Sequence, residues 1–107
     1  SLNYLVDLLT LNENLVVQLE SHTDSRGTSA SNLELSQRRA ETCVDFLVGK
    51  GISSDRLIPV GHGEEILKIS DAQIAAMPEE DRDAAHGENR RTVFKIVRFD
   101  YVPLDNK

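Results

Sequence analysis

Residues 15–50 constrain the fold of this chain more than any other part of the sequence. A short apolar run at 15–19, rich in Val and Leu, predicts a buried strand. The polar stretch 22–27 follows as a turn, and candidate N-caps at 28–31 precede a helix that runs to about Lys50. Gly51 then provides the left-handed residue that often ends a helix. This stretch therefore predicts a strand, a turn and a long helix.

The turn and the helix place one acid and one base on opposite sides of their connection. Asp24 lies in the turn, and Arg39 follows 15 residues later. At about 100° per residue, Arg39 lies on the flank of the apolar helix face, whereas Arg38 points to water. An acid and a base that are held apart could receive a zwitterion, with Asp24 holding its ammonium group and Arg39 its carboxylate. On the residues alone the favoured interpretation is a turn-former for Asp24 and a solvated or surface-paired side chain for Arg39.

The rest of the chain adds two strands and further helices. Residues 1–12 have one apolar helical face, and residues 56–60 predict a strand that Pro59 assigns to an edge or irregular position. A loop is expected at 61–63, a short helix after the capping box of Ser70, and a last strand at 92–99. We predict one domain over residues 1–107, an α+β two-layer sandwich with its helices on one face of a small mixed sheet.

Composition excludes several classes of protein. The net charge of −6 and the absence of Trp do not fit a nucleic-acid binder, and no apolar run approaches the length of a membrane span. The single Cys43 predicts a buried, inert thiol. His22, His62 and His86 lack the spacing of metal or catalytic motifs. We therefore predict no metal, no cofactor and no enzymatic activity.

A series of motifs spans residues 2–98. In chain order they are Thr23-Asp24 with Gly27, Asn32, Leu35-Ser36, Arg38-Arg39-Ala40, Gly51-Ile52, Arg56-Leu57, Gly61-His62-Gly63-Glu64 and Asn89-Arg90-Arg91. This series closely resembles the OmpA-like C-terminal domain, which binds peptidoglycan in Gram-negative bacteria. The resemblance implies that the first strand of the family fold is missing here, so that the chain is an N-terminally truncated fragment of a larger envelope protein. An unpaired sheet edge could then promote a homodimer.

The resemblance also implies a ligand site for diaminopimelate, the diamino acid of the peptidoglycan stem peptide. Its residues would be Asp24, Arg39, Asn32, Thr23, Leu35, Asn89 and Arg90. Asp24 would contact the amine of diaminopimelate, and Arg39 would grip its carboxylate. Asn32 could equally brace the turn, and the sequence leaves open whether Arg90 or Arg91 faces the pocket.

The function implied is non-covalent binding of peptidoglycan, which would tether the outer membrane or an envelope protein to the cell wall. The domain would be periplasmic, and any membrane attachment would come from the part of the protein outside this chain. One alternative is a dimerising, stator-type domain of the same superfamily with conditional wall binding. Two less favoured alternatives are a cell-wall peptide hydrolase and a domain that binds a protein partner.

Overall fold

The computed structural model describes residues 2–103. Its three strands form one mixed sheet in the order β2-β1-β3, in which β1 runs parallel to β2 and antiparallel to β3. In chain order the elements are α1 (Leu2–Leu11), β1 (Val16–His22), α2 (Ser29–Gly49), the 3-10 turn η1 (Ser54–Arg56), β2 (Leu57–Gly63), α3 (Asp71–Ala75), α4 (Glu79–Asn89) and β3 (Arg91–Arg98).

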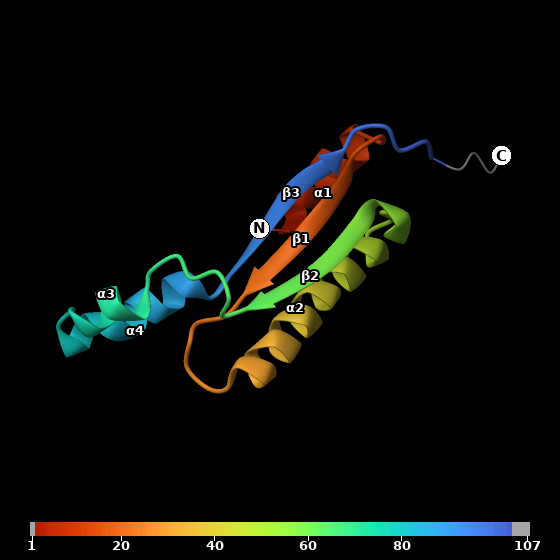
Figure 1. Cartoon of the computed structure of the whole chain (residues 1–107). Coiled ribbons are helices and arrows are strands. Elements are labelled where there is room, and N and C mark those ends of the chain that lie inside the picture. Colours follow the sequence, from red (N-terminus) through yellow and green to blue (C-terminus); the bar gives the residue numbers. More distant parts are fainter. Residues whose placement is uncertain (1, 104–107) are drawn as a thin grey trace.

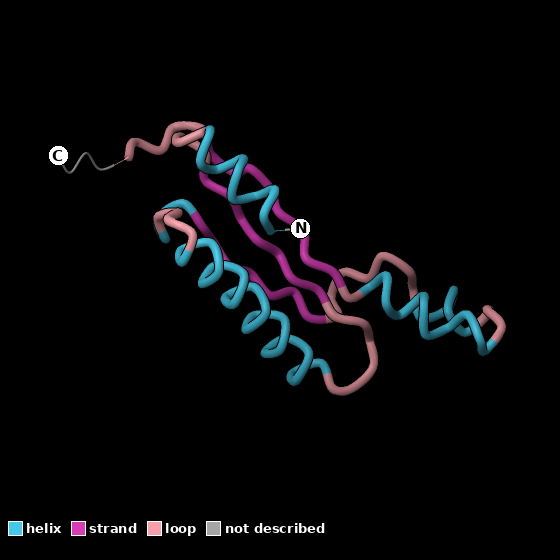
Figure 2. The backbone as a smooth tube through the Cα atoms, turned by 180° about the vertical axis from the view of Figure 1, so that it is seen from behind, coloured by secondary structure: helices cyan, strands magenta, loops and turns pink. Residues whose placement is uncertain are grey.

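Helices α1 and α2 lie on the same face of the sheet and leave the other face uncovered (Figures 1 and 2). This arrangement confirms the predicted α+β fold with two main helices on one side of a mixed sheet. Helices α3 and α4 form a helical hairpin that extends beyond the end of the sheet (Figure 1). The hairpin makes the domain elongated, with extents of 59 × 24 × 22 Å.

The core lies between the sheet and its two covering helices. Leu5 and Leu9 of α1, Val17 and Leu19 of β1, and Leu47 of α2 have no exposed surface. Val17 and Leu19 are two residues apart and therefore point to the same side of the sheet. Burying each of these side chains contributes about 1.5–3 kcal/mol to folding. Gln18 and Glu20, between and beyond them, consequently face the uncovered side.

Helix α2 approaches strand β2 closely because β2 carries glycine there. A Cβ atom at Gly61 would lie 2.3 Å from the backbone nitrogen of Gln37. The Gly61 N–H donates to Oε1 of Gln37 at 2.8 Å, and the Gly63 N–H donates to Oγ of Ser36 at 2.8 Å. The prediction of a loop at 61–63 was therefore wrong, because side chains of α2 and the pairing with β1 hold these residues in the strand.

The helix ends agree with several sequence expectations. Thr28 caps α2 by accepting from the N–H of Ser31, and Gly51 has a φ of 99° just beyond the helix end. The capping box of Ser70 and Gln73 opens α3. Helix α4 was not predicted, although three acids in its first turn after Pro78 favour a helix N-terminus.

Arg56 is a buried cation at the end of the sheet opposite the turn that carries Asp24. Its Nη2 donates to the carbonyls of Leu9 at 2.9 Å and Asn12 at 2.6 Å, and its Nε donates to that of Leu15 at 3.0 Å. These bonds fasten the C-terminal end of α1 and the connection to β1, and the Leu9 carbonyl is one of those that a helix end leaves unpaired. Arg56 also lines a hollow of about 460 Å³, but its guanidinium already donates to these three carbonyls.

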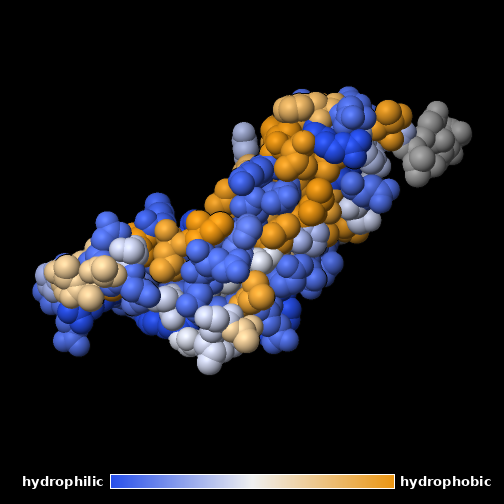
Figure 3. All heavy atoms as spheres, viewed as in Figure 1, coloured by the Kyte–Doolittle hydropathy of each residue, from blue (hydrophilic) through white to orange (hydrophobic). Residues whose placement is uncertain are grey.

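Strand β3 forms one edge of the sheet, and its side chains are largely exposed. Figure 3 shows apolar side chains gathered over the strands. Within β3, Val93, Phe94 and Ile96 are each more than a third exposed. Cys43 is half-buried beside the core, where burial raises the pKa of its thiol, in keeping with an unreactive side chain. None of the helices within residues 2–103 has the length and apolarity needed to cross a bilayer.

Candidate functional site

The predicted site lies where β1 ends and the chain turns toward α2. The N–H of Thr23 donates to the carbonyl of Gly63 at 2.8 Å, so the ends of β1 and β2 are fastened together just before the turn. Gly27 has a φ of 92°, a conformation that favours glycine. The turn is thus a defined structure at one end of the sheet.

Asp24 is buried in this turn and accepts hydrogen bonds on both carboxylate oxygens. Its Oδ1 accepts from the backbone N–H of Arg26 at 2.9 Å, and its Oδ2 accepts from Nη2 of Arg26 at 2.8 Å and Nη1 of Arg90 at 2.6 Å. Burial acts to raise the pKa of Asp24, but the hydrogen bonds from Arg26 and Arg90 outweigh it and hold the pKa well below its ordinary value. Asp24 is therefore an ionised carboxylate with two guanidinium partners.

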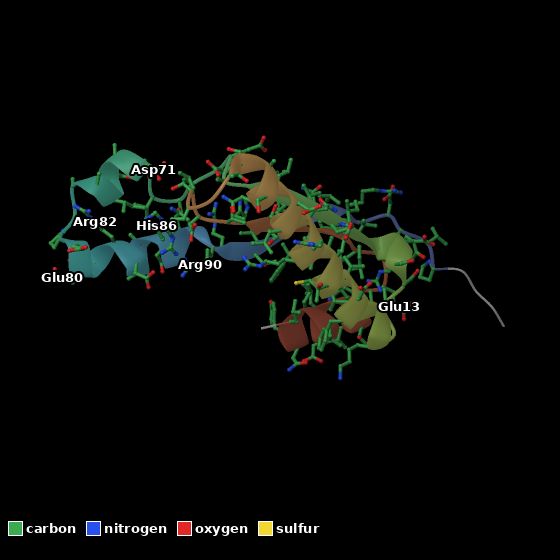
Figure 4. The ribbon with its side chains drawn as sticks, turned by 90° about the horizontal axis from the view of Figure 1, so that it is seen from below. Glu13, Asp71, Glu80, Arg82, His86 and Arg90 are labelled. Atoms are coloured by element: carbon green, nitrogen blue, oxygen red, sulfur yellow. The ribbon has the colours of Figure 1, made fainter. Side chains whose placement is uncertain are left out.

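The helical hairpin contacts the turn through Arg26 and Ser25. Arg26 donates from Nη1 to Asp83 of α4 at 3.0 Å, and the hydroxyl of Ser25 donates to Asp71 of α3. These contacts, together with the Arg90–Asp24 pair, join the turn to both helices of the hairpin, which is far from it in sequence. Figure 4 shows Arg90 where α4 meets the sheet, at the opposite end of the domain from Glu13.

Asn32 braces the turn from the first turns of α2. Its buried Nδ2 lies 3.2 Å from the carbonyl of Asp24, 3.0 Å from that of Arg26 and 2.9 Å from Oε1 of Glu64. An amide nitrogen has two hydrogens, so three acceptors share them. The structure thus gives Asn32 a bracing role, while its contact with the Asp24 backbone places it beside the predicted ligand residue.

Arg39 is placed as the helical wheel predicts, exposed on the flank of α2. Together with Arg90 and Arg91 it lines a hollow of about 260 Å³, whose other lining residues are Ser21, His22 and Thr92. Within residues 2–103, the guanidinium of Arg39 has no hydrogen-bond or ion-pair partner. Three guanidinium groups around one hollow favour an anionic group such as a carboxylate.

The remaining predicted residues have partners within the protein. Thr23 is buried and its hydroxyl donates to the carbonyl of Asp24 at 3.0 Å, while Leu35 is half-buried on α2. Asn89 is fully buried and exchanges two hydrogen bonds with the backbone of Ile69, at 2.8 and 2.9 Å. Asn89 therefore fastens the loop before α3 to the end of α4.

The structure separates the roles of the two neighbouring arginines. Both line the hollow, but Arg90 binds the Asp24 carboxylate, whereas Arg91 donates to the carbonyls of Asn89 and Ile66, each at 3.2 Å. Sequence reasoning missed Arg26 as a partner of Asp24. The sequence did contain a signal for this contact, because Arg26 lies two residues after Asp24. The side chain of a turn aspartate often accepts a hydrogen bond from the backbone N–H two residues further along the chain.

Comparison with known proteins agrees with the fold. The model of the OmpA family matches residues 1–81. The chain belongs to the OmpA family. A peptidoglycan-associated lipoprotein from Buchnera aphidicola is 32% identical over 93 residues, which cover 87% of this chain and 49% of that protein. The chain spans less than half the length of this and other curated relatives of the same name.

Solved structures show the same architecture. The crystal structure of the peptidoglycan-associated lipoprotein from Burkholderia pseudomallei has a TM-score of 0.71 at 27% identity, covering 88% of this chain and 74% of that one. A MotB-like protein from Desulfovibrio vulgaris has a TM-score of 0.67 at 26% identity, covering 87% of this chain and 55% of that one. These matches confirm the predicted OmpA-like fold.

Proposed function

We propose that this OmpA-family domain binds peptidoglycan non-covalently by holding the diaminopimelate of the stem peptide between Asp24 and Arg39. The observation that carries the proposal is the hollow in which Arg39, an exposed guanidinium with no partner in the described chain, lies beside Arg90. Arg39 would take a ligand carboxylate in a bidentate contact, and Arg90 would add positive charge at the same hollow. The family assignment supports binding without any bond being broken.

The ammonium group of the ligand would approach Asp24. A carboxylate has about four lone-pair directions, and among residues 2–103 only the N–H of Arg26 donates to Oδ1 of Asp24, so this oxygen retains capacity for a further donor. Arg26 is roughly half-exposed and also bonded to Asp83, so its side chain could turn toward Asp83 when an ammonium arrives. Ligand binding would therefore exchange one guanidinium partner of Asp24 for the ligand amine.

Asn32 and Thr23 would act through the turn that presents Asp24. Both contact the Asp24 backbone carbonyl, and Asn32 also contacts that of Arg26. Leu35 would offer apolar contact from α2, and Asn89 would hold the end of α4 from which Arg90 extends. Of the seven proposed residues, Asp24, Arg39 and Arg90 would thus supply the charges, and the other four would shape their surroundings.

Arg39 is exposed on α2, and an ionic contact at an exposed side chain contributes only modestly to the affinity for a single ligand. A cell wall presents many copies of the stem peptide, which raises the effective concentration for a protein held close to it. We propose that the domain resides in the periplasm and tethers the outer membrane, or an envelope protein attached to it, to the wall.

A dimerising, stator-type role is the second candidate. The similarity to the MotB-like protein and the exposed apolar side chains on edge strand β3 favour it. An edge strand offers unpaired backbone groups to a second copy. Sedimentation equilibrium at micromolar concentration distinguishes a stator-type role from wall tethering. A stator-type domain should be a dimer in the absence of peptidoglycan.

Sedimentation with insoluble, diaminopimelate-type peptidoglycan tests the wall-binding proposal. We expect the wild type to sediment with the wall, and Asp24→Ala and Arg39→Ala to stay in solution. Arg38→Ala is the matched control, because Arg38 is an exposed neighbour that lies 4.0 Å from Glu34 on the solvent side of α2. Circular dichroism first establishes that each variant is folded. Equal sedimentation of all four proteins, or none by the wild type, would overturn the proposed site.

A further inference from the structure

Three side chains that do not form a spaced motif in the sequence lie close together on the uncovered face of the sheet. Glu20 and His22 are two residues apart on β1, so they point to the same side. Glu20 pairs with Val60 of β2, and His62 is two residues beyond Val60 on that strand. Parallel pairing of β1 and β2 therefore places His62 beside Glu20 and His22, opposite the face that α2 covers.

The three side chains have the donor atoms of a metal site. One donor atom each from Glu20, His22 and His62 lies within 4.8 Å of the other two. The two imidazole rings stack with centroids 4.9 Å apart and an interplanar angle of 19°. Nε2 of His62 lies 3.3 Å from Oε1 of Glu20, although the two are not aligned as a hydrogen bond.

Two ring nitrogens in this cluster are buried without a partner. Nδ1 of His22 and Nε2 of His62 have no hydrogen bond within the described chain, and His22 is only 2% exposed. Burying a polar atom without a partner is costly, so such atoms call for an explanation. A bound cation would satisfy both nitrogens.

The Glu20 carboxylate is already held in place by its other oxygen. Oε2 accepts from Nε2 of Gln18 at 2.6 Å and lies 3.1 Å from Nζ of Lys95, which leaves Oε1 on the side of His62. Metal-ligating carboxylates commonly have such supporting hydrogen bonds. The Lys95 ammonium opposes a cation, but its side chain is 60% exposed and can turn into solvent.

We propose that Glu20, His22 and His62 form a binding site for a divalent transition-metal ion of the Zn²⁺ class. Two imidazoles and one carboxylate are a ligand set that suits Zn²⁺ and leaves a fourth position for water. Tetrahedral ligands at Zn²⁺ distances are about 3.4 Å apart. The three donors lie within 4.8 Å of one another, and Nε2 of His62 is already 3.3 Å from Oε1 of Glu20, so side-chain rotation would have to close only the longer separations. His62 also lines a hollow of about 260 Å³, whose other lining residues are Ser29, Ala30, Leu33, Glu64 and Glu65.

A metal ion here would join the ends of β1 and β2 immediately before the turn that carries Asp24. The Thr23–Gly63 hydrogen bond already fastens these two strands at that point. His22 also lines the hollow of Arg39, but none of the three metal ligands is among the residues assigned to diaminopimelate. The metal proposal therefore does not depend on the peptidoglycan proposal.

Titration of the metal-free chain with ZnCl₂ by isothermal calorimetry tests the proposal, with Co²⁺ as a spectroscopic probe. We expect one ion per chain, a Co²⁺ spectrum without sulfur charge transfer, and a rise in the melting temperature. In wild-type protein, the imidazole NMR signals of His22 and His62 should shift on Zn²⁺ binding, whereas those of His86, in the projecting hairpin, should not (Figure 4).

Single-residue variants test which side chains bind the metal ion. His62→Ala and Glu20→Gln should each weaken Zn²⁺ binding by at least about tenfold, while His86→Ala and Cys43→Ser should leave it unchanged. Circular dichroism identifies any variant that fails to fold, and the wild-type NMR result then decides. No binding by the wild type, unmoved His22 and His62 signals, or unchanged affinity in a folded His62→Ala protein would overturn the site.

Discussion

Replacing Asp24 by Asn removes the charge at the centre of the turn while nearly preserving the shape of the side chain. The amide oxygen can still accept from the N–H of Arg26, but the two guanidinium contacts made by Oδ2 lose their anionic acceptor. Hydrogen bonds to charged groups contribute about 1.5–3 kcal/mol each. Because Arg26 and Arg90 are partly exposed and can turn to water, we expect a total loss of about 2–3 kcal/mol rather than the full sum.

The pH dependence of this loss follows from the direction of the pKa shift. The pKa of Asp24 in the folded protein lies below the ordinary value of 3.8. The carboxylate's contribution is therefore fully present above pH 3.8 and is lost as the pH falls through the lower, folded value. The difference in stability between wild type and Asp24→Asn should be complete at pH 7 and should begin to shrink below pH 3.8.

Urea unfolding followed by circular dichroism measures this difference at pH 7 and at pH 3. A loss of about 2–3 kcal/mol corresponds to a fall of about 10 °C or more in the melting temperature of a domain of this size. Asp83→Asn is the control, because Asp83 is an exposed partner of Arg26, and we expect no measurable change. Equal stability of Asp24→Asn and wild type at pH 7 would refute the assignment of Asp24 as an anchored, ionised carboxylate.

Two further predictions concern the scaffold and use the same unfolding assay. Arg56→Met should lower the free energy of unfolding by about 3–5 kcal/mol, because three carbonyls lose a buried charged donor, whereas exposed Arg98→Met should have little effect. Equal losses in the two variants would contradict this role of Arg56. Gly61→Ala should cost about 3 kcal/mol or more, since its Cβ would meet the Gln37 backbone, whereas Gly49→Ala has open space and should be neutral or slightly stabilising. A Gly61→Ala protein as stable as wild type would show that α2 does not press on β2 as described.

The sequence predicted those parts of the fold that local patterns determine. The strand–turn–helix of residues 15–50 was predicted because a short apolar run, candidate N-caps at 28–31 and a left-handed Gly51 each act over a few residues, and the structure places the N-cap at Thr28. Arg39 on the helix flank follows from helical periodicity alone.

Features that depend on contacts between residues far apart in the sequence could not be predicted from local patterns. Arg90 reaches Asp24 across 66 residues, and only the folded hairpin shows that it is a partner of that carboxylate. The pairing of His22 with His62 depends on the parallel register of β1 and β2, including the bulge between Ser21 and His22. Spacing rules for metal motifs act along one element, so they do not detect ligands that adjacent strands bring together.

Calorimetric titration with soluble stem peptides tests the central proposal most directly. The wild-type domain should bind a peptide that contains diaminopimelate at least about tenfold more tightly than one that contains lysine, which lacks the carboxylate assigned to Arg39. Arg39→Ala should lose this preference, and Arg38→Ala should retain it. Equal affinity of the wild type for the two peptides, or an undiminished preference in Arg39→Ala, would contradict the proposal that Arg39 recognises the diaminopimelate carboxylate.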